Sequence, residues 1–547
     1  MPALSLAPDL ILLNARIHTM DAGAATAAAV AVKDGRFVAV GAADEVGALV
    51  GAGTRVEDLG GATVVPGLID AHNHLLATGL MLGQVPLYDC RSLREVLERV
   101  AGRARATRPG AWIVGRGWDE SLLAEGRPPT RAELDAAAPD HPVLLHRVWN
   151  KLVCNSAALR LAGITAASPD PPADAPYAGS FDRDGTGEPT GLFRDRAKAL
   201  IADRVPAPTE DELVAAIGVA CRAYNAVGIT GVAEPGLDPD QIRAFDRARR
   251  EGALTVRTEL LLAGWGFGPA ASEVGMAERF AGLGVAGGFG DDRLRLGGVK
   301  LMPDGGIGDR TARVFAPYLD EPDNRGTWVV EPGRLAEHVR WVHDLGWATD
   351  IHTCGDEAQE VAVRAIAAAQ AANPKSWLRH RVHHAYFPTP EALRLMAAHG
   401  IPALVSAPFL ANLGESFVNA LGEERAARAM PMRAYLDAGV GLAATSDAPI
   451  TDHNPFVGMQ VATTRATAAG RVLGPAEALT PIEALRAYTT GAAAALGQER
   501  TRGAIAVGLL ADLAVLDADP LAVPADRLGA IRPMATMLDG VWVHDRR

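Results

Sequence analysis

Residues 65–74 read Val-Pro-Gly-Leu-Ile-Asp-Ala-His-Asn-His, an apolar run that ends in two histidines one residue apart. Because successive side chains of a β-strand alternate between its two faces, His72 and His74 point the same way. Two imidazole nitrogens at that spacing can share one metal ion. The alternative is two polar residues that hydrogen-bond to the backbone where a strand ends. The pattern predicts a buried strand with a candidate metal-binding pair at its C-terminal end.

Strand-like runs alternate with helical stretches along most of the chain that follows. The alanine-rich segments 334–345 and 356–371 are two of these helical stretches. Such alternation is typical of βα units and a parallel sheet. A count of eight strands favours a closed barrel over an open, doubly wound sheet. The predicted strands are residues 64–71, 228–234, 255–263, 294–302, 348–353, 379–385, 401–406 and 440–446.

The two ends of the chain follow another pattern, with short β-rich runs broken by turn residues. Residues 36–40 follow a Lys-Asp-Gly turn, and residues 511–516 form a similar run near the other end. Neither end has enough strands for a stable sheet of its own. We therefore expect residues 1–63 and 500–547 to pair into one small β-sandwich.

The gap between the first two predicted strands is too long for a single crossover helix. Clusters of Pro and Gly at residues 169–176 and 182–191 are typical of loops. We expect an inserted cap segment at residues 87–205, which leaves residues 64–86 and 206–499 for the barrel. The predicted fold is of the α/β class: a (β/α)₈ TIM-like barrel, a small β-sandwich formed from both chain termini, and an insertion after barrel strand 1.

Composition narrows the classes of partner and compartment. Of the 547 residues, 48% are hydrophobic and 22% are charged, which is typical of a folded globular protein. The net charge of −12 is spread without a basic stripe, so nucleic acid is not expected as a partner. The four cysteines form no CxxC pair, which favours a reducing cytoplasm over a disulfide framework. No run approaches the roughly 18 apolar residues of a membrane helix, and no export signal is expected at the N-terminus.

Two further histidines lie at the ends of predicted strands. His352 closes the fifth strand and His384 the sixth, and catalytic residues of such barrels come from the C-terminal ends of several strands. His383 directly precedes His384, so on a strand the two side chains face opposite ways and only one of them can be a ligand. Four histidines on one rim favour a metal site. Five others are expected to serve packing: His338, His343, His380, His399 and His453.

Asp447 and Lys300 complete the candidate site. Asp447 follows the eighth strand, where its carboxylate can take the proton of a metal-bound water, the role of a general base in hydrolysis. The alternative is that Asp447 caps a helix. Lys300 lies inside an apolar strand, where an ammonium group is costly unless it is paired or chemically altered.

These motifs together resemble the amidohydrolase superfamily, specifically the amidohydrolase-3 group that includes N-substituted formamide deformylases. The resemblance covers nearly the whole chain. Besides His-x-His, it rests on Lys-x-x-x-Asp-Gly at residues 300–305, on Gly-Asp after His352, and on Ser-Asp-x-Pro at residues 446–449. Further landmarks lie at residues 115–118, 155–159 and 508–513.

The resemblance implies an enzyme that cleaves a carbon–nitrogen bond of an amide-like substrate, such as an N-acyl or N-formyl amine, by attack of metal-bound hydroxide. It implies one or two divalent metals, with zinc expected. His72 and His74 would bind the buried metal together with Asp447. A carboxylated Lys300 would bridge to a second metal, and that metal would be held by His352 and His384.

Two positions depart from the family pattern. Relatives commonly show Arg-x-Glu-His on the sixth strand, whereas this chain has His383 at the place of the carboxylate. Because neighbouring groups orient metal ligands, the electrostatics there can differ. Relatives also tend to carry a histidine five residues before the Asn-Ser of the insertion, and Asn150 stands there in this chain.

The substrate is left open by these patterns. Hydroxide attack suits a carbamate, a cyclic amide, an ester or a lactone as well as an amide. A non-catalytic binding protein of the same fold is another alternative, although all six metal positions are filled. Arg310, Trp118 and Asn150 are candidate substrate contacts. We expect a small-molecule substrate and a cytoplasmic enzyme without a membrane or nucleic-acid partner, and a homodimer is one arrangement left open.

Overall fold

The structure is a computed structural model that describes residues 7–23, 25–147, 151–171, 179–264 and 276–547. The chain forms two compact units. One unit contains residues 1–78 and 217–547, and the other contains residues 79–216. Among the described residues, no helix has the length and apolar character needed to cross a membrane.

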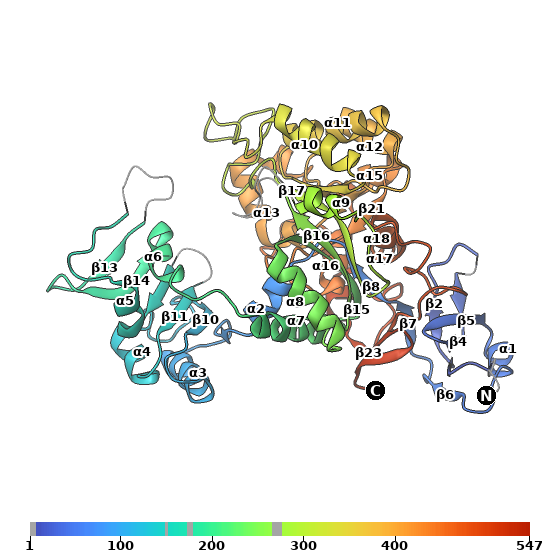
Figure 1. Ribbon diagram of the computed structural model, residues 1–547, viewed down its shortest axis with the longest axis horizontal. Helices are drawn as coiled ribbons and strands as arrows, with labels where there is room; N and C mark the ends of the chain where they lie inside the picture. Colours follow the sequence, from blue (N-terminus) through green and yellow to red (C-terminus); the bar gives the residue numbers. More distant parts are fainter. Residues whose placement is uncertain (1–6, 24, 148–150, 172–178, 265–275) are drawn as a thin grey trace. The chain divides into compact units, whose positions relative to one another are not determined.

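The larger unit is built around a parallel sheet of eight strands in the order β21-β20-β19-β18-β17-β16-β15-β8 (Figure 1). The two outer strands meet where the Ala71 N–H faces the Ala444 carbonyl at 3.4 Å, and the Asp447 N–H donates to the His72 carbonyl at 2.9 Å. The sheet is therefore a nearly closed barrel, which confirms the predicted fold class. Its strands are β8 (Leu68–Asp70), β15 (Ile229–Leu237), β16 (Arg257–Ala263), β17 (Leu294–Leu301), β18 (Ala348–Thr353), β19 (Arg381–His384), β20 (Ala403–Val405) and β21 (Leu442–Ala444).

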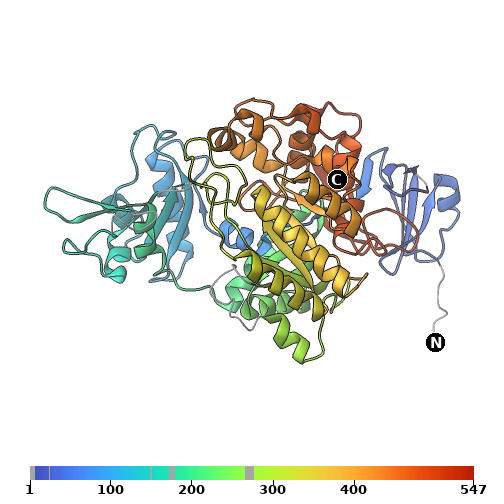
Figure 2. The ribbon, with the colours of Figure 1, turned by 90° about the horizontal axis from the view of Figure 1, so that it is seen from above.

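Helices between the strands cover the outside of the barrel. The views in Figures 1 and 2 agree that α10, α11 and α12 lie side by side on one flank. Small alanine side chains on the inner face of α11 let this helix pack closely against the barrel strand β18. Proline occupies the first turn of many of these helices, because a backbone N–H at that position would have no acceptor within the helix. The main helices are α8 (Pro239–Arg250), α10 (Pro332–Asp344), α11 (Asp356–Ala372), α12 (Pro390–His399), α13 (Pro408–Leu421), α15 (Met432–Asp437), α16 (Pro455–Thr464), α17 (Pro481–Ala487) and α18 (Thr490–Ala495).

The first predicted strand, residues 64–71, is broken at Gly67, so its expected continuity was wrong. Residues before the break form β7 (Thr63–Pro66), which pairs with a terminal strand, and residues after it form β8 of the barrel. A Cβ atom on Gly67 would lie 2.2 Å from Thr230 Oγ1. The Gly67 N–H donates to the Asp512 carbonyl at 2.9 Å. One short segment thus joins two sheets at a point where only glycine fits.

Two sheets at the chain termini form the predicted sandwich. One has four strands in the order β5-β4-β1-β6, and the other has six in the order β24-β23-β22-β7-β2-β3, which mixes both ends of the chain. Leu12 and Val30 share one buried core with Leu513 and Met537. The exact boundaries at residues 63 and 500 stay a prediction. The strands are β1 (Leu10–Leu13), β2 (Arg16–His18), β3 (Thr26–Ala27), β4 (Ala29–Lys33), β5 (Arg36–Gly41), β6 (Arg55–Asp58), β22 (Leu513–Leu516), β23 (Pro533–Leu538) and β24 (Val541–Asp545).

The unit of residues 79–216 has a sheet of its own, with six strands in the order β13-β14-β12-β11-β10-β9. Separate apolar clusters around Val96 and Phe193 cover it. The unit includes the predicted insertion, residues 87–205, whose limits stay a prediction. Its main elements are β9 (Val85–Pro86), α3 (Leu93–Ala106), β10 (Ile113–Trp118), α4 (Arg131–Ala137), β11 (Val143–Arg147), β12 (Lys151–Cys154), α5 (Ser156–Ala162), β13 (Phe181–Arg183), β14 (Pro189–Arg194) and α6 (Ala199–Ala202).

Candidate metal centre

The C-terminal ends of the barrel strands bring the predicted ligands into one region. Asp70, the last residue of β8, holds the two outer strands in register here. Its carboxylate accepts the N–H of Ser446 at 3.0 Å and that of His72 at 3.3 Å, and the Asn73 side-chain amide donates to it at 3.0 Å. Burial raises the pKa of Asp70 to about 6, although these hydrogen bonds act to lower it. Asp70 therefore positions both the His-x-His segment and the loop that carries Asp447.

Three side chains form the centre of this region. His72 Nε2 lies 3.1 Å from Asp447 Oδ1, and His74 Nε2 lies 3.2 Å from the same oxygen. One donor atom from each of the three residues lies within 4.8 Å of the others. Asp447 Oδ1 is buried and accepts no hydrogen bond. Two imidazole nitrogens and one carboxylate oxygen that converge in this way are a donor set that zinc accepts.

The charge states of His72 and Asp447 suit metal binding. Burial lowers the pKa of His72 to about 3, and the positive charge of Lys300 acts in the same direction. The His72 imidazole is therefore neutral at physiological pH, with a lone pair to donate. Burial opposes ionisation of Asp447, yet the imidazoles of His72 and His384 hold its pKa well below the usual range. Both groups are in the deprotonated form that a metal requires.

Lys300 lies at the end of β17, buried at 2% exposure. Burial lowers its pKa to about 8, while the charges of Asp447 and Asp350 oppose that shift. Its charge in turn lowers the pKa of His352, for which burial is the larger cause. Lys300 is thus within electrostatic reach of the predicted ligands on both sides of it.

His352 and His384 form the second half of the predicted site. Their ring centroids lie 4.4 Å apart, and the His384 ring lies 5.3 Å from that of His72. His384 Nδ1 is buried without a hydrogen-bond partner. His352 Nε2 lies 3.1 Å from the Gly305 carbonyl. Neither histidine belongs to the cluster of three donors described above, so their role as ligands of a second metal stays a prediction.

The expectation that His383 and His384 face opposite ways was wrong. Strand β19 ends at His384, whose backbone has φ = 66°, and Ala385 follows with φ = 49°. This left-handed turn departs from the alternation of a regular strand. His383 Nδ1 lies 2.6 Å from His72 Nδ1, while the His384 ring lies beside His72 and His352. Both neighbours therefore lie beside His72 at the candidate metal centre.

His383 links His72 to a buried carboxylate. His383 Nε2 lies 2.7 Å from Asp350 Oδ1. Because His72 Nε2 is turned toward Asp447, the ring proton of His72 belongs on Nδ1, where it donates to His383 Nδ1. His383 then donates from Nε2 to Asp350. Arg381 binds Asp350 through two contacts of 2.5 and 2.8 Å, which hold this carboxylate in place.

Several buried carboxylates of the site were not singled out from the sequence. Asp350 was one, although a charged residue inside the apolar strand 348–353 was a signal that could have found it. Asp304 was recognised only as the aspartate of the Lys-x-x-x-Asp-Gly motif. It accepts the N–H groups of Arg313, Cys354 and Gly355, and burial raises its pKa to about 7. Asp304 therefore holds the loop after β17 against the loop that follows His352.

The three candidate substrate residues stay predictions. Arg310 is engaged by acidic neighbours, with Nε 3.0 Å from Asp320 and 3.2 Å from Glu321. Trp118 is fully buried in the unit of residues 79–216, and its ring N–H donates to the Leu145 carbonyl at 3.0 Å. That contact gives Trp118 a part in the core of its unit. Asn150 lies outside the described residues.

Sequence comparison identifies the family to which this geometry belongs. The model of the amidohydrolase family matches residues 55–544. The chain belongs to that family, and it is a hydrolase that acts on carbon–nitrogen bonds, as the motifs predicted.

Particular relatives extend over almost the whole chain. An N-substituted formamide deformylase of Arthrobacter pascens is 33% identical, with 98% of each chain covered. The putative amidohydrolase YtcJ of Bacillus subtilis is 29% identical, covering 97% of this chain and 98% of the relative. The solved structure of an uncharacterized metal-dependent hydrolase from Pyrococcus furiosus is similar at a TM-score of 0.76 and 28% identity, with 94% of this chain and 99% of the other covered.

Proposed function

We propose that this enzyme hydrolyses an N-formyl or N-acyl amine at a zinc centre held by His72, His74 and Asp447. The observation that carries the proposal is the convergence of their three donor atoms within 4.8 Å, with Asp447 Oδ1 buried and without a hydrogen bond. The relative named as a formamide deformylase supports the substrate class. When bound, the zinc ion supplies a Lewis acid that polarises the substrate carbonyl and makes water acidic.

Asp447 moves the proton in this proposal. Its pKa lies well below the usual range, so the carboxylate is ionised and can accept a proton from the attacking water. The same carboxylate then passes the proton to the nitrogen of the leaving amine. His72 and His74 keep the carboxylate oriented, because each lies within 3.2 Å of Oδ1.

Lys300 is the candidate bridge to a second metal held by His352 and His384. With a pKa of about 8, a sizeable fraction of its amine is neutral near physiological pH. A neutral amine can add to carbon dioxide, which forms a bond between Nζ and carbon and releases one proton. The product replaces a buried positive charge with a carboxylate, which removes the cost of burying the ammonium.

Asp447→Asn tests the assigned chemistry. The variant keeps the size of the side chain but loses the basic oxygen, so we expect turnover to fall by at least about 10²-fold while folding is retained. The measurement is release of formate or carboxylate by the zinc-loaded enzyme from a panel of N-formyl amines, N-acyl amines, carbamates, cyclic amides and lactones. Near-normal turnover of the variant contradicts the role of Asp447. Preference for a carbamate or a lactone contradicts the substrate class and leaves the metal centre standing.

Lys300→Ala tests the second half of the site. Loss of the bridging group is expected to reduce bound metal per chain, because His352 and His384 alone hold an ion weakly. Metal content by elemental analysis is the measurement, with Lys375→Ala as the matched control, since Lys375 lies over the Trp377 ring away from the centre. Unchanged metal content in Lys300→Ala would rule out a ligand role.

Composition supports a proposal for compartment and partners, and the oligomeric state is left open. We propose a cytoplasmic enzyme that acts on small molecules, as a monomer or a homodimer, without a nucleic-acid partner. All four cysteines are free and buried, which suits a reducing compartment. The net charge of −12 disfavours binding to nucleic acid.

A further inference from the structure

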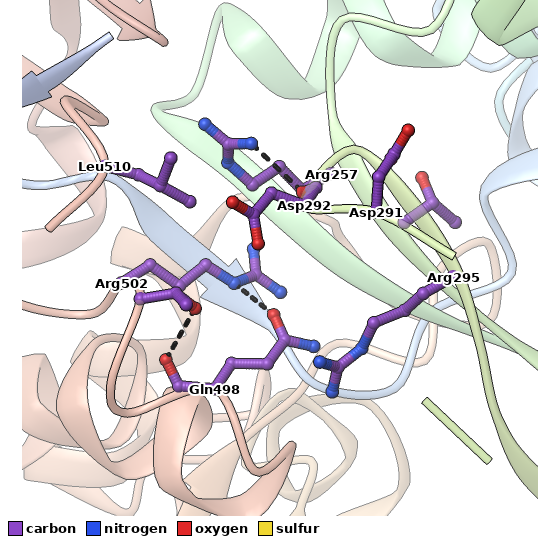
Figure 3. Close-up of a pocket in the computed structure, with 9 residues that line it drawn as sticks. Arg257, Asp291, Asp292, Arg295, Gln498, Arg502 and Leu510 are labelled. Atoms are coloured by element: carbon purple, nitrogen blue, oxygen red, sulfur yellow. Dashed lines mark hydrogen bonds between the residues drawn. The ribbon is translucent and has the colours of Figure 1, made fainter. Parts of the chain in front are cut away.

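A small cavity lies at the end of the barrel opposite the metal centre. Arg257 and Arg295 line it from the starts of β16 and β17, and Gln498 and Arg502 line it from the segment before the C-terminal strands (Figure 3). Its volume of about 10 Å³ leaves room for a single small particle, such as a water molecule or a monatomic ion. None of these residues takes part in the proposed chemistry.

Arg502 is the unusual member of this cavity. It is a buried arginine, 3% exposed, whose Nε donates to Gln498 Oε1 at 2.5 Å. Its Nη1 is buried without a hydrogen-bond partner. Within the described part of the chain, no carboxylate forms an ion pair with Arg502. A buried guanidinium that meets only a neutral amide is costly.

The other charges around the cavity already have partners. Arg257 pairs with Asp512 at 2.6 Å, and Arg295 pairs with Glu259 at 2.6 Å. Glu259 is further engaged by Arg381 at 2.6 Å and by the Gln498 amide at 2.8 Å. The positive charge of Arg502 is therefore in excess.

The two aspartates on the rim of the cavity do not remove this excess. Asp291 accepts the N–H groups of Arg293 and Leu294 at 2.8 and 2.9 Å, and Asp292 pairs with Arg36 at 3.0 Å. Both carboxylates are thus held by other groups.

The fold makes room for the Arg502 guanidinium. Gly231 in β15 lies directly against it, and a Cβ atom at that position would be 1.7 Å from Nη1. Any other residue would push the guanidinium away. Burial lowers the pKa of Arg502 to about 9, and the positive charge of Arg257 acts in the same direction. The group is still protonated at neutral pH, so a compensating negative charge would stabilise it.

We propose that this cavity is a halide site, in which a chloride ion lies against the guanidinium of Arg502 beside Arg257 and Arg295. The available volume admits a monatomic anion and excludes phosphate and sulfate. The ion would neutralise the excess charge and tie residues 498–502 to the starts of β16 and β17. Chloride is therefore expected to act on stability rather than on turnover.

Crystals of the unaltered full-length protein grown with bromide in place of chloride test the site directly. We expect an anomalous bromide peak in this cavity, in contact with the guanidinium of Arg502. An ordered water at that place, with no anomalous signal, would overturn the proposal.

Melting temperature gives a second measurement in solution. At constant ionic strength, with chloride exchanged for gluconate, the melting temperature of the unaltered protein should rise by about 1–2 °C for each tenfold increase in chloride above the dissociation constant. Arg502→Met should abolish this dependence. Arg500→Met is the matched control, since Arg500 is exposed two residues away, and it should keep the dependence. Equal slopes in both variants contradict the proposal, and the crystallographic experiment covers a failure of Arg502→Met to fold.

Discussion

His383 links a ligand of the candidate metal centre to a buried carboxylate, at the position where the family resemblance predicted a glutamate. An imidazole there accepts a hydrogen bond from one histidine and donates another to a carboxylate, whereas an ionised glutamate can only accept. The contacts of 2.6 Å to His72 and 2.7 Å to Asp350 form a continuous hydrogen-bonded chain. Asp350 therefore influences His72 through the hydrogen bonds of the His383 ring and not by direct contact. Partners of this kind set the orientation and basicity of a metal ligand.

His383→Gln is predicted to weaken zinc binding by roughly 10–100-fold, since the amide cannot link His72 to Asp350 as the ring does. The measurement is competition for zinc with a chelator, with secondary structure followed in parallel. His399→Gln is the matched control, because His399 lies outside the centre, with its Nδ1 3.1 Å from the side-chain oxygen of Gln370. Equal zinc affinity in the two variants would show that His383 merely fills space.

At the scale of elements, helix α17 shows how local signals and tertiary contacts combine. Glu483 in its first turn accepts the Thr480 N–H at 2.8 Å and the Thr480 hydroxyl at 2.6 Å, which closes the start of the helix. The same carboxylate accepts hydrogen bonds from both terminal nitrogens of Arg433 in α15. One side chain thus caps a helix and joins it to another.

Glu483→Gln is predicted to lower the free energy of unfolding by about 1 kcal/mol at neutral pH, from loss of the partly exposed ion pair with Arg433, because a glutamine oxygen can still accept from Thr480. The hydrogen bonds from Arg433 lower the pKa of Glu483 from 4.5 to about 2. Because the folded-state pKa is depressed, the stabilisation is complete above pH 4.5 and disappears as the pH falls toward 2.

Urea unfolding at neutral pH and at pH values between 4.5 and 2 measures this effect. The difference between the unaltered protein and Glu483→Gln should shrink as the pH falls. Glu424→Gln is the control, since Glu424 is exposed and should show little difference at any pH. A difference that grows on acidification would contradict the assigned ion pair.

On the scale of the whole molecule, the metal centre lies where the barrel closes. His72 and His74 follow β8, the first strand of the sheet, and Asp447 follows β21, the last. Few backbone hydrogen bonds join these two outer strands. A metal held by both would clamp the closure. Residues 79–216 have apolar cores of their own and contribute none of these ligands.

Metal removal is therefore predicted to destabilise the larger unit selectively. For zinc at about a thousandfold excess over its dissociation constant, the loss corresponds to a fall of roughly 5 °C in melting temperature. Scanning calorimetry with and without a chelator measures it, and added zinc should restore the original trace. Equal shifts of every transition, or none, would argue against a clamp at the closure.

Local patterns along the chain were enough to predict the barrel and the sandwich, and the family resemblance added the grouping of His72 and His74 with Asp447. Periodicity and turn residues place each strand, and parallel strands deliver their C-terminal ends to one rim. The strand bounds agree to within a few residues in most places. Such features depend on neighbours in sequence, so they can be recognised without a structure.

Contacts between distant segments decided the rest. The apolar run that was expected to form one strand is divided at Gly67. Thr230 leaves no room there for a side chain. A left-handed turn at His384 brings both neighbouring histidines into the centre. His383 meets Asp350, and Arg502 is left without a carboxylate, only once the strands are assembled. Side-chain alternation and composition carry no information about these pairings, because each depends on the packing of residues far apart in the chain.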